Sequence, residues 1–259
     1  MLGSPIAHSL SPTLHRAAYE HLGLDWTYEA IEVRENELAG LVRSLDDTWR
    51  GLSLTMPLKR AAVRVATSTV EPVGLTGVAN TLVLDGGRRV AHNTDVAGMQ
   101  TALGEAGIAQ VSRATVLGGG STAAAAVAAL APVANDLVVV VRSPRRAAAV
   151  QAVADRAGVR LTLVEWVRAA EALTSPVVVS TTPAGASDSL VGAVPDDPGL
   201  LFDVVYDPWP TALAAGWTAA GGRVLSGLDL LVHQAVGQVA LMTGSTVPVE
   251  VLRTAVRKR

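Results

Sequence analysis

The stretch VLGGGSTA at residues 116–123 says more about the fold of this 259-residue chain than any other. An apolar segment leads into three consecutive glycines, and an alanine-rich segment follows them. This order predicts a strand, a tight turn and the start of a helix. Residues 118–123 also match G-x-G-x-x-A, a pattern typical of dinucleotide-binding sites, although any glycine-rich loop between a strand and a helix would match it.

A dinucleotide at this turn has a physical basis. Glycines permit the tight turn and a close approach of the backbone to a pyrophosphate, and a helix N-terminus favours the negative charge of that group. We therefore predict a cofactor site that includes Gly118, Gly119, Gly120, Ser121 and Thr122. A purely structural turn is the alternative.

The run RSPRR at residues 142–146 bears on the choice of cofactor. It begins about 24 residues after Gly118, where an NAD site would place Asp or Glu to accept from the ribose 2′-hydroxyl. Guanidinium groups instead match the oxygens of a 2′-phosphate. We predict NADP, with Arg142, Ser143 and Arg146 in the site. The alternative is a solvated helix start with Pro144 in its first turn.

Short apolar runs alternate with alanine-rich segments through the second half of the chain. Because these runs are continuously apolar, they predict parallel strands that are buried on both faces, at residues 138–141, 159–164, 177–180 and 200–205. Helical segments are expected between them, at residues 123–131, 145–156 and 211–220. This alternation predicts an α/β fold with parallel sheets.

The order of the motifs predicts two α/β domains. The candidate catalytic residues precede the glycine turn, and an amphipathic segment that begins near Gly227 can return the chain to the first domain. We expect a substrate-binding domain at residues 1–95 with 228–259, and a Rossmann-type NADP-binding domain at residues 96–227. The active site would lie in the cleft between them, a common place for ligands.

Composition excludes several classes of function. A net charge of −2 gives no basic footprint for nucleic acid, and no apolar run is long enough to span a membrane. The absence of cysteine excludes disulfides and thiol nucleophiles, and the five histidines show no metal-binding spacing. The start of the chain has no signal-peptide pattern. We expect a cytoplasmic protein, a monomer or homodimer, without a metal, nucleic-acid or membrane partner.

Three polar runs are candidates for chemistry. Lys59 ends the run LTMPLK, and Asp95 ends the run NTD some 36 residues later. A Lys/Asp pair can move a proton on a hydroxyl group, but a lone loop lysine is usually solvated and such an aspartate usually caps a helix. In the run SLSP, we expect Ser11 to cap a helix with Pro12 in its first turn, and Ser9 and Ser11 could also bind a carboxylate.

Five blocks in this order resemble the shikimate dehydrogenase family over nearly the whole chain. They lie at residues 3–12, at 54–59, at 77–82 with 93–95, at the glycine turn with its basic run, and at 203–208 with 231–235. The resemblance implies that the substrate carboxylate is held by Ser9, Ser11 and Tyr206. It implies that ring hydroxyls are bound by Thr55, Asn80, Asp95 and Gln234. It also makes Lys59 the catalytic acid/base, assisted by Asp95, and places Gly227 near the nicotinamide.

The resemblance implies an NADP-dependent shikimate dehydrogenase, which interconverts 3-dehydroshikimate plus NADPH with shikimate in aromatic amino-acid (chorismate) biosynthesis. A relative that acts on quinate or an aminoshikimate is the alternative within the family. A regulatory protein that binds the cofactor without turnover is an alternative of another class.

The chain departs from the family pattern at a few positions. The family usually has Asn at the positions of Arg16, Val141 and Ser180, and the last two departures bear on contacts to the adenosine. The family also has more residues before Gly3, so we expect a truncated first strand or a true start upstream.

Overall fold

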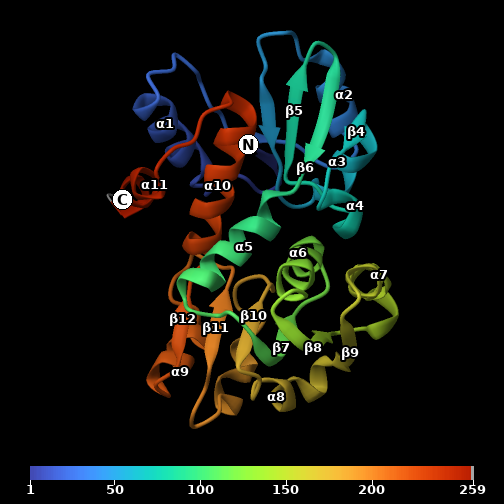
Figure 1. Cartoon of the computed structure of the whole chain (residues 1–259), viewed down its shortest axis with the longest axis vertical. Helices are drawn as coiled ribbons and strands as arrows, with labels where there is room; N and C mark the ends of the chain where they lie inside the picture. The colour runs from blue at the N-terminus through green and yellow to red at the C-terminus, as the bar shows by residue number, and fades with distance from the viewer. Residues whose placement is uncertain (258–259) are drawn as a thin grey trace. The chain divides into compact units, whose positions relative to one another are not determined.

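A computed structural model describes residues 1–257, and the side chain of Arg146 lies outside the described part. The chain divides into two compact units (Figure 1). The first comprises Met1–Gly98 and the chain from Leu231 onward, and the second comprises Met99–Leu230. Helices α5 (Thr94–Glu105) and α10 (Gly227–Thr243) carry the chain from one unit to the other.

The first unit contains a mixed four-stranded sheet. Its strands lie in the order β3 (Gly51–Ser53), β5 (Thr81–Asp85), β6 (Arg88–His92) and β4 (Ser68–Thr69). The expectation of parallel sheets is wrong here, because β5 pairs antiparallel with both β3 and β6. The reason is the connection: only Gly86 and Gly87 separate β5 from β6, and both have positive φ, which closes a tight hairpin. A separate parallel pair is formed by β1 (Leu2–Gly3) and β2 (Ile31–Glu32).

Helices cover this sheet and build a second core beside it. Leu38, Leu58 and Leu82 belong to the core between the sheet and the short helices α2 (Leu38–Ser44), α3 (Lys59–Val65) and α4 (Val73–Thr76). The other core lies among α1 (Ser11–His21), α10 and α11 (Val249–Arg257). There Leu14 and Leu252 are fully buried. The C-terminal segment therefore belongs physically to the first unit.

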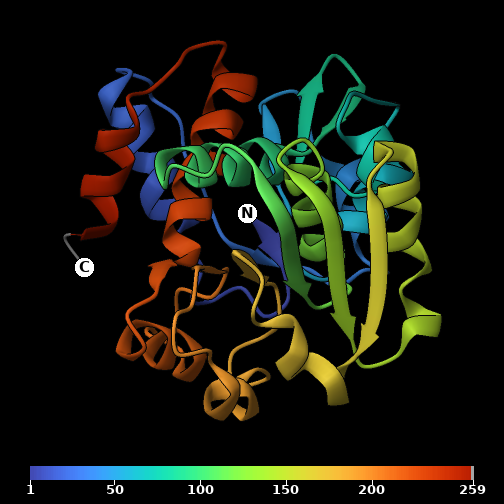
Figure 2. The same ribbon diagram turned by 60° about the horizontal axis from the view of Figure 1, so that its bottom comes forward.

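The second unit is built on a six-stranded sheet that is parallel throughout, as the continuously apolar runs predict (Figure 2). The strand order is β12 (Arg223–Leu225), β11 (Leu200–Asp203), β10 (Val177–Ser180), β7 (Val111–Leu117), β8 (Ala134–Val141) and β9 (Arg160–Glu165). The first strand in sequence, β7, lies in the middle of the sheet. Later strands are added first on one side of it (β8, β9) and then on the other (β10, β11, β12), which is the Rossmann arrangement. The carboxyl ends of β7 and β10 flank this switch point.

Small side chains let the helices of the second unit pack closely on the sheet. In α6 (Ser121–Leu130), all eight residues from Ala123 onward are buried. Trp217 fills the core with no exposed area. The remaining helices are α7 (Ala148–Ala157), α8 (Ala169–Ala172) and α9 (Ala212–Ala219), and 3-10 turns occur at η1 (Pro144–Arg146), η2 (Trp166–Arg168) and η3 (Asp188–Ala193).

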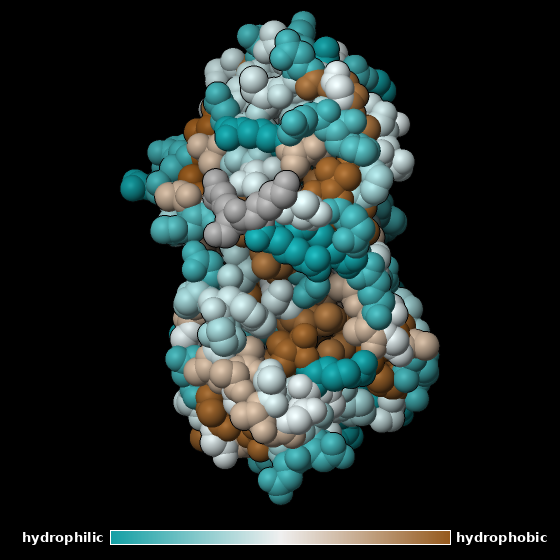
Figure 3. All heavy atoms as spheres, turned by 90° about the vertical axis from the view of Figure 1, so that its left-hand side faces the viewer, coloured by the Kyte–Doolittle hydropathy of each residue, from teal (hydrophilic) through white to brown (hydrophobic). Residues whose placement is uncertain are grey.

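Apolar side chains are mostly inside each unit. On the face drawn in Figure 3, hydrophilic and intermediate residues cover most of the surface and hydrophobic ones form separate areas. Val167, 85% exposed, and Met56, 62% exposed, are the most exposed of the large apolar residues in the described part of the chain. Within residues 1–257, none of the helices combines the length and apolarity that a membrane crossing needs.

Candidate active site

Lys59 is placed by a tight turn that precedes its helix. The backbone N–H of Leu58 donates to the Thr55 carbonyl at 2.7 Å, and Lys59 is then the first residue of α3. Gly3 passes so close to this turn that a Cβ there would lie 2.9 Å from the Met56 carbonyl oxygen and would collide with the Thr55 methyl group. Only a glycine at position 3, in β1, therefore leaves room for the turn at Thr55 and Met56.

Asp95 lies in the first turn of α5, where a negative charge is favoured by the helix dipole. Its backbone N–H donates to Asn93 Oδ1 at 3.0 Å, and Asn93 in turn donates to the Val78 carbonyl at 3.1 Å. Asp95 thus also helps to start the helix, as its position in the sequence suggests. Its carboxylate accepts from Lys59.

Lys59 and Asp95 form a buried ion pair. The distance from Lys59 Nζ to Asp95 Oδ2 is 2.7 Å, and the two side chains are 12% and 5% exposed. Water screens a pair at this depth much less than a surface pair, so their attraction is strong and each depends on the other. The structure thus places in direct contact the Lys/Asp pair that the sequence suggests for proton transfer.

Asn80 lies at the centre of the polar groups beside this pair. Its Nδ2 donates at 2.9 Å to both Asp95 Oδ1 and Thr94 Oγ1, and it lies 3.3 Å from Gln234 Oε1. Its Oδ1 accepts from the Thr94 backbone N–H at 2.9 Å. Four predicted residues, Lys59, Asn80, Asp95 and Gln234, therefore form one connected cluster in the first unit.

Several residues of this cluster were not predicted from the sequence. Thr94 accepts from Asn80, and Gly237 lets α10 approach, because a Cβ there would lie 3.1 Å from the Thr94 methyl group. Gln238 and Thr81 also bond to this region. Gln238 follows Gln234 by one helical turn, so a shared helix face was available as an indication.

The predicted cap of α1 is wrong in detail. Ser11 is already inside the helix, Leu10 is the N-cap residue, and Ser9 Oγ accepts from the Ser11 backbone N–H at 3.3 Å. Ser9 reaches that N–H because it lies two residues earlier, outside the helix. Ser11 is fully buried, and its Oγ has no hydrogen-bond partner among the described residues. Thr55, by contrast, is half-buried.

The glycine turn lies in the second unit, between β7 and α6. Gly118 has φ +113°, and a Cβ there would lie 2.6 Å from Thr181 Oγ1. A Cβ on Gly119 would lie 2.9 Å from a methyl group of Val141, whereas one on Gly120 would meet nothing within 4 Å. Gly120 is the N-cap residue of α6 and gives no side-chain cap, and Ser121 and Thr122 open the helix. The first N–H groups of α6 are therefore available to an anion.

The basic run follows β8 in the same sheet. Arg142 and Arg145 are exposed and Ser143 is half-buried, with η1 beginning at Pro144. The side chain of Arg146, also predicted to bind the cofactor, lies outside the described residues. Since β7 and β8 are neighbours in the sheet, this run and the glycine turn follow the carboxyl ends of adjacent strands.

Tyr206 and Gly227 also belong to the second unit. Tyr206 is half-buried in the segment after β11. Gly227 donates its N–H to the Val205 carbonyl at 3.0 Å, and a Cβ at Gly227 would collide with the Val204 carbonyl oxygen. Gly227 is therefore required for the close approach of α10 to the strand end, independently of any ligand.

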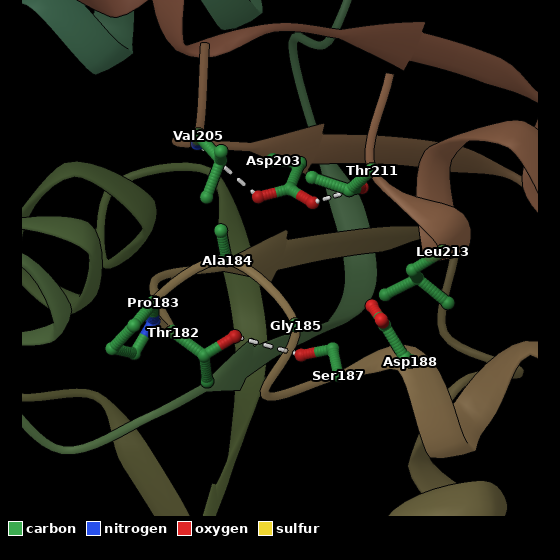
Figure 4. Close-up of a pocket in the computed structure, with 10 residues that line it drawn as sticks. All are labelled: Thr182, Pro183, Ala184, Gly185, Ser187, Asp188, Asp203, Val205, Thr211 and Leu213. Atoms are coloured by element: carbon green, nitrogen blue, oxygen red, sulfur yellow. Dashed lines mark hydrogen bonds between the residues drawn. The ribbon is translucent and has the colours of Figure 1, made fainter. Parts of the chain in front are cut away.

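A small polar cavity lies near the ends of β10 and β11 (Figure 4). Asp203 Oδ2 accepts from Thr211 at 2.8 Å and Oδ1 from the Val205 N–H at 3.2 Å, and burial raises the pKa of this carboxyl. The cavity measures about 10 Å³, which is hardly room for one water, so it does not hold a substrate. A larger cavity of about 330 Å³ in the first unit, beside Trp49 and Arg50, contains none of the predicted site residues.

These features define a class before any comparison. The Rossmann sheet with its glycine turn is typical of dinucleotide binding, and the buried Lys59–Asp95 pair is suited to proton transfer. Together they are what a nicotinamide-dependent dehydrogenase requires.

Comparison with known proteins identifies the family. Residues 1–82 match the shikimate dehydrogenase substrate binding domain, and residues 227–257 match the shikimate 5'-dehydrogenase C-terminal domain. Shikimate dehydrogenase (NADP(+)) of Oleidesulfovibrio alaskensis is 35% identical over 259 residues, 96% of this chain and 90% of the relative. The chain belongs to the shikimate dehydrogenase family.

Solved structures agree over nearly the full length. Mycobacterium tuberculosis shikimate dehydrogenase is 44% identical, with a TM-score of 0.88 and coverage of 99% of this chain and 97% of that one. Shikimate 5-dehydrogenase from Thermus thermophilus, in complex with NADP(H) and shikimate, is 32% identical, with a TM-score of 0.86 and coverage of 99% and 97%.

The geometry of the glycine turn yields a test with a matched control. Gly118→Ala should lower the free energy of unfolding by about 1–3 kcal/mol, because alanine must adopt a positive φ and press on Thr181. Gly120→Ala should cost less, at most about 1 kcal/mol, because its φ of −86° suits alanine and its surroundings are open, so that the loss comes only from the weaker N-cap preference of alanine. Urea unfolding measures both. Equal losses would show that the backbone of Gly118 carries no special constraint.

Proposed function

We propose that the protein is an NADP-dependent shikimate dehydrogenase, which interconverts 3-dehydroshikimate plus NADPH with shikimate in aromatic amino-acid biosynthesis. The observation that carries this proposal is the buried Lys59–Asp95 pair joined to Asn80 and Gln234, in a chain of this family. The first unit would hold the substrate and the second the cofactor. A cytoplasmic location and a monomeric or homodimeric state stay predictions.

The pair supplies the proton of the reaction. In reduction, the Lys59 ammonium donates a proton to the carbonyl oxygen as that oxygen gains charge, and in oxidation the neutral amine accepts the hydroxyl proton. Asp95 holds Nζ in place at 2.7 Å. NADP, when bound, supplies or takes the hydride. Direct transfer requires that the bound substrate and the nicotinamide meet.

Neutral groups around the pair would bind the ring. Asn80, Thr55 and Gln234 offer the donors and acceptors that a polyhydroxylated ring needs, and Asp95 can accept from a hydroxyl. For the carboxylate we propose Ser9, Ser11 and Tyr206. The buried Ser11 hydroxyl has no partner among the described residues, so a bond to the ligand would relieve the cost of leaving it unpaired.

The second unit offers features that fit a dinucleotide. Gly118 and Gly119 bring the backbone close to its neighbours, and the uncapped N-terminus of α6 can receive a pyrophosphate at Gly120, Ser121 and Thr122. Arg142, Ser143 and Arg146 would meet the 2′-phosphate. Gly227 would lie near the nicotinamide.

Two other functions remain as alternatives. A dehydrogenase for quinate or an aminoshikimate would use the same proton-transfer pair and differ in the fine shape of the ring pocket. A regulatory protein without turnover would not need the Lys59–Asp95 pair, and burying two charges is costly, so the pair favours catalysis.

A four-way assay tests the proposed function. Purified protein should reduce NADP with shikimate, seen as a rise in absorbance at 340 nm, faster than it does with quinate or with NAD in place of NADP. Preference for quinate would favour the alternative within the family. No absorbance change with any combination would favour the regulatory protein.

Arg142 and Arg145 form a matched pair for testing cofactor choice. Arg142→Ala should raise the KM for NADP about 10- to 100-fold, because one charge-assisted hydrogen bond is worth about 1.5–3 kcal/mol, and should leave NAD nearly untouched. Raised salt should narrow the NADP preference. Arg145→Ala, to which we assign no role, is the control. Equal effects of the two substitutions would mean that general surface charge, and not Arg142, selects NADP.

A further inference from the structure

Gln238 is a buried amide in α10 whose donors and acceptor all have partners. It is 1% exposed. Its Nε2 donates to the Asn80 carbonyl at 3.0 Å and to Thr81 Oγ1 at 2.9 Å. Its Oε1 accepts from Ser53 Oγ at 2.9 Å and lies 3.2 Å from His15 Nε2. No part of this amide is left for a ligand, so its role must act through its neighbours.

The direction of these bonds is fixed from both sides. A backbone carbonyl can only accept, so the Gln238 nitrogen must face Asn80 and its oxygen must face His15. Burial lowers the pKa of His15 to about 3, so the ring is neutral, and its proton must lie on Nε2. The His15 ring is also held by stacking on Tyr28, with centroids 4.1 Å apart.

The next two links are oriented in the same way. Thr81 Oγ1 accepts from Gln238, so its proton is free to donate to Asn80 Oδ1, 2.8 Å away. The Thr94 backbone N–H donates to the same oxygen, which leaves the Asn80 amide nitrogen facing Asp95 Oδ1 at 2.9 Å. A flipped Asn80 amide would set its oxygen against the carboxylate and its nitrogen against two donors.

One chain of donors therefore runs in a single direction toward the carboxylate. It passes through His15, Gln238, Thr81 and Asn80 and ends on Asp95, whose other oxygen receives Lys59. All of its members belong to the first unit. Hydrogen bonds aligned head to tail polarise one another, so the far end of such a chain can influence the near end.

We propose that Gln238 is a positioning residue for the reaction, which acts through Thr81 to hold the Asn80 amide in the orientation that Asp95 and the substrate ring require. This inference rests on the proposed function for its substrate. Gln238 touches neither substrate nor cofactor in this account. Its loss should therefore weaken shikimate binding and leave NADP binding intact.

Two substitutions break the chain at successive links. Gln238→Leu and Thr81→Val should each raise the KM for shikimate about three- to tenfold, the change expected for one ordinary buried hydrogen bond. Thr81→Ser keeps the hydroxyl and should stay within about twofold of the wild type. Because both links lie in one chain, the double variant should be no worse than Thr81→Val by more than about twofold.

A buried threonine of the second unit gives the structural control. Thr115 has no exposed area and its hydroxyl donates to the Ala172 carbonyl at 2.8 Å. Thr115→Val should lower the melting temperature and leave both KM values unchanged. If Gln238→Leu behaves like this control, or if it raises the two KM values equally, Gln238 has only a structural role and the inference is overturned.

A measurement without substrate separates this inference from the proposed function. In 15N-labelled protein, Gln238→Leu should shift the side-chain NH2 signals of Asn80 and speed their exchange with water. The side chain of Gln151, bonded to Asp155 in the second unit, should be unaffected. Unchanged Asn80 signals would overturn the inference. A wild type that fails to oxidise shikimate would refute the proposed function alone, since the NMR result stands without turnover.

Discussion

The buried ion pair between Lys59 and Asp95 is the interaction on which the active part of the first unit depends. Two charges at this depth lose most of their hydration, and their attraction offsets that cost only when the geometry is good and the other oxygen is hydrogen-bonded. Asn80 provides that bond. The turn before α3, the start of α5 and the approach of α10 all serve to bring these groups together.

In the second unit the corresponding constraint is steric, because the backbone passes too close to neighbouring atoms to carry a side chain at three positions. Gly118, Gly119 and Gly227 are glycines because neighbouring atoms occupy the space a side chain would need. The backbone at these strand ends and helix starts can therefore pass close to neighbouring segments of the chain. Under the proposed function, the first unit would supply fixed polar side chains for the substrate ring, and the second would supply backbone N–H groups for the pyrophosphate of the cofactor.

The sequence predicted the fold best where a residue pattern has a single physical explanation. Continuously apolar runs predicted the parallel strands of the second unit correctly, whereas the polar strand RRVAH of β6 was missed and made the first sheet mixed. The Lys59–Asp95 contact spans 36 residues, so it was predicted from the family resemblance and not from local spacing. Gln238 was missed because a glutamine on a helix usually faces solvent, and Ser11 was misassigned because a serine before proline usually caps.

The most direct test of the central claim is the kcat of Lys59→Ala, measured on folded protein with saturating shikimate and NADP. Loss of a positioned acid/base should lower kcat by about 10²- to 10⁴-fold and change KM much less, because the missing interaction belongs mainly to the transition state. A variant that keeps near-normal kcat would contradict the account, since the buried pair would then be structural and the proton would travel by another route.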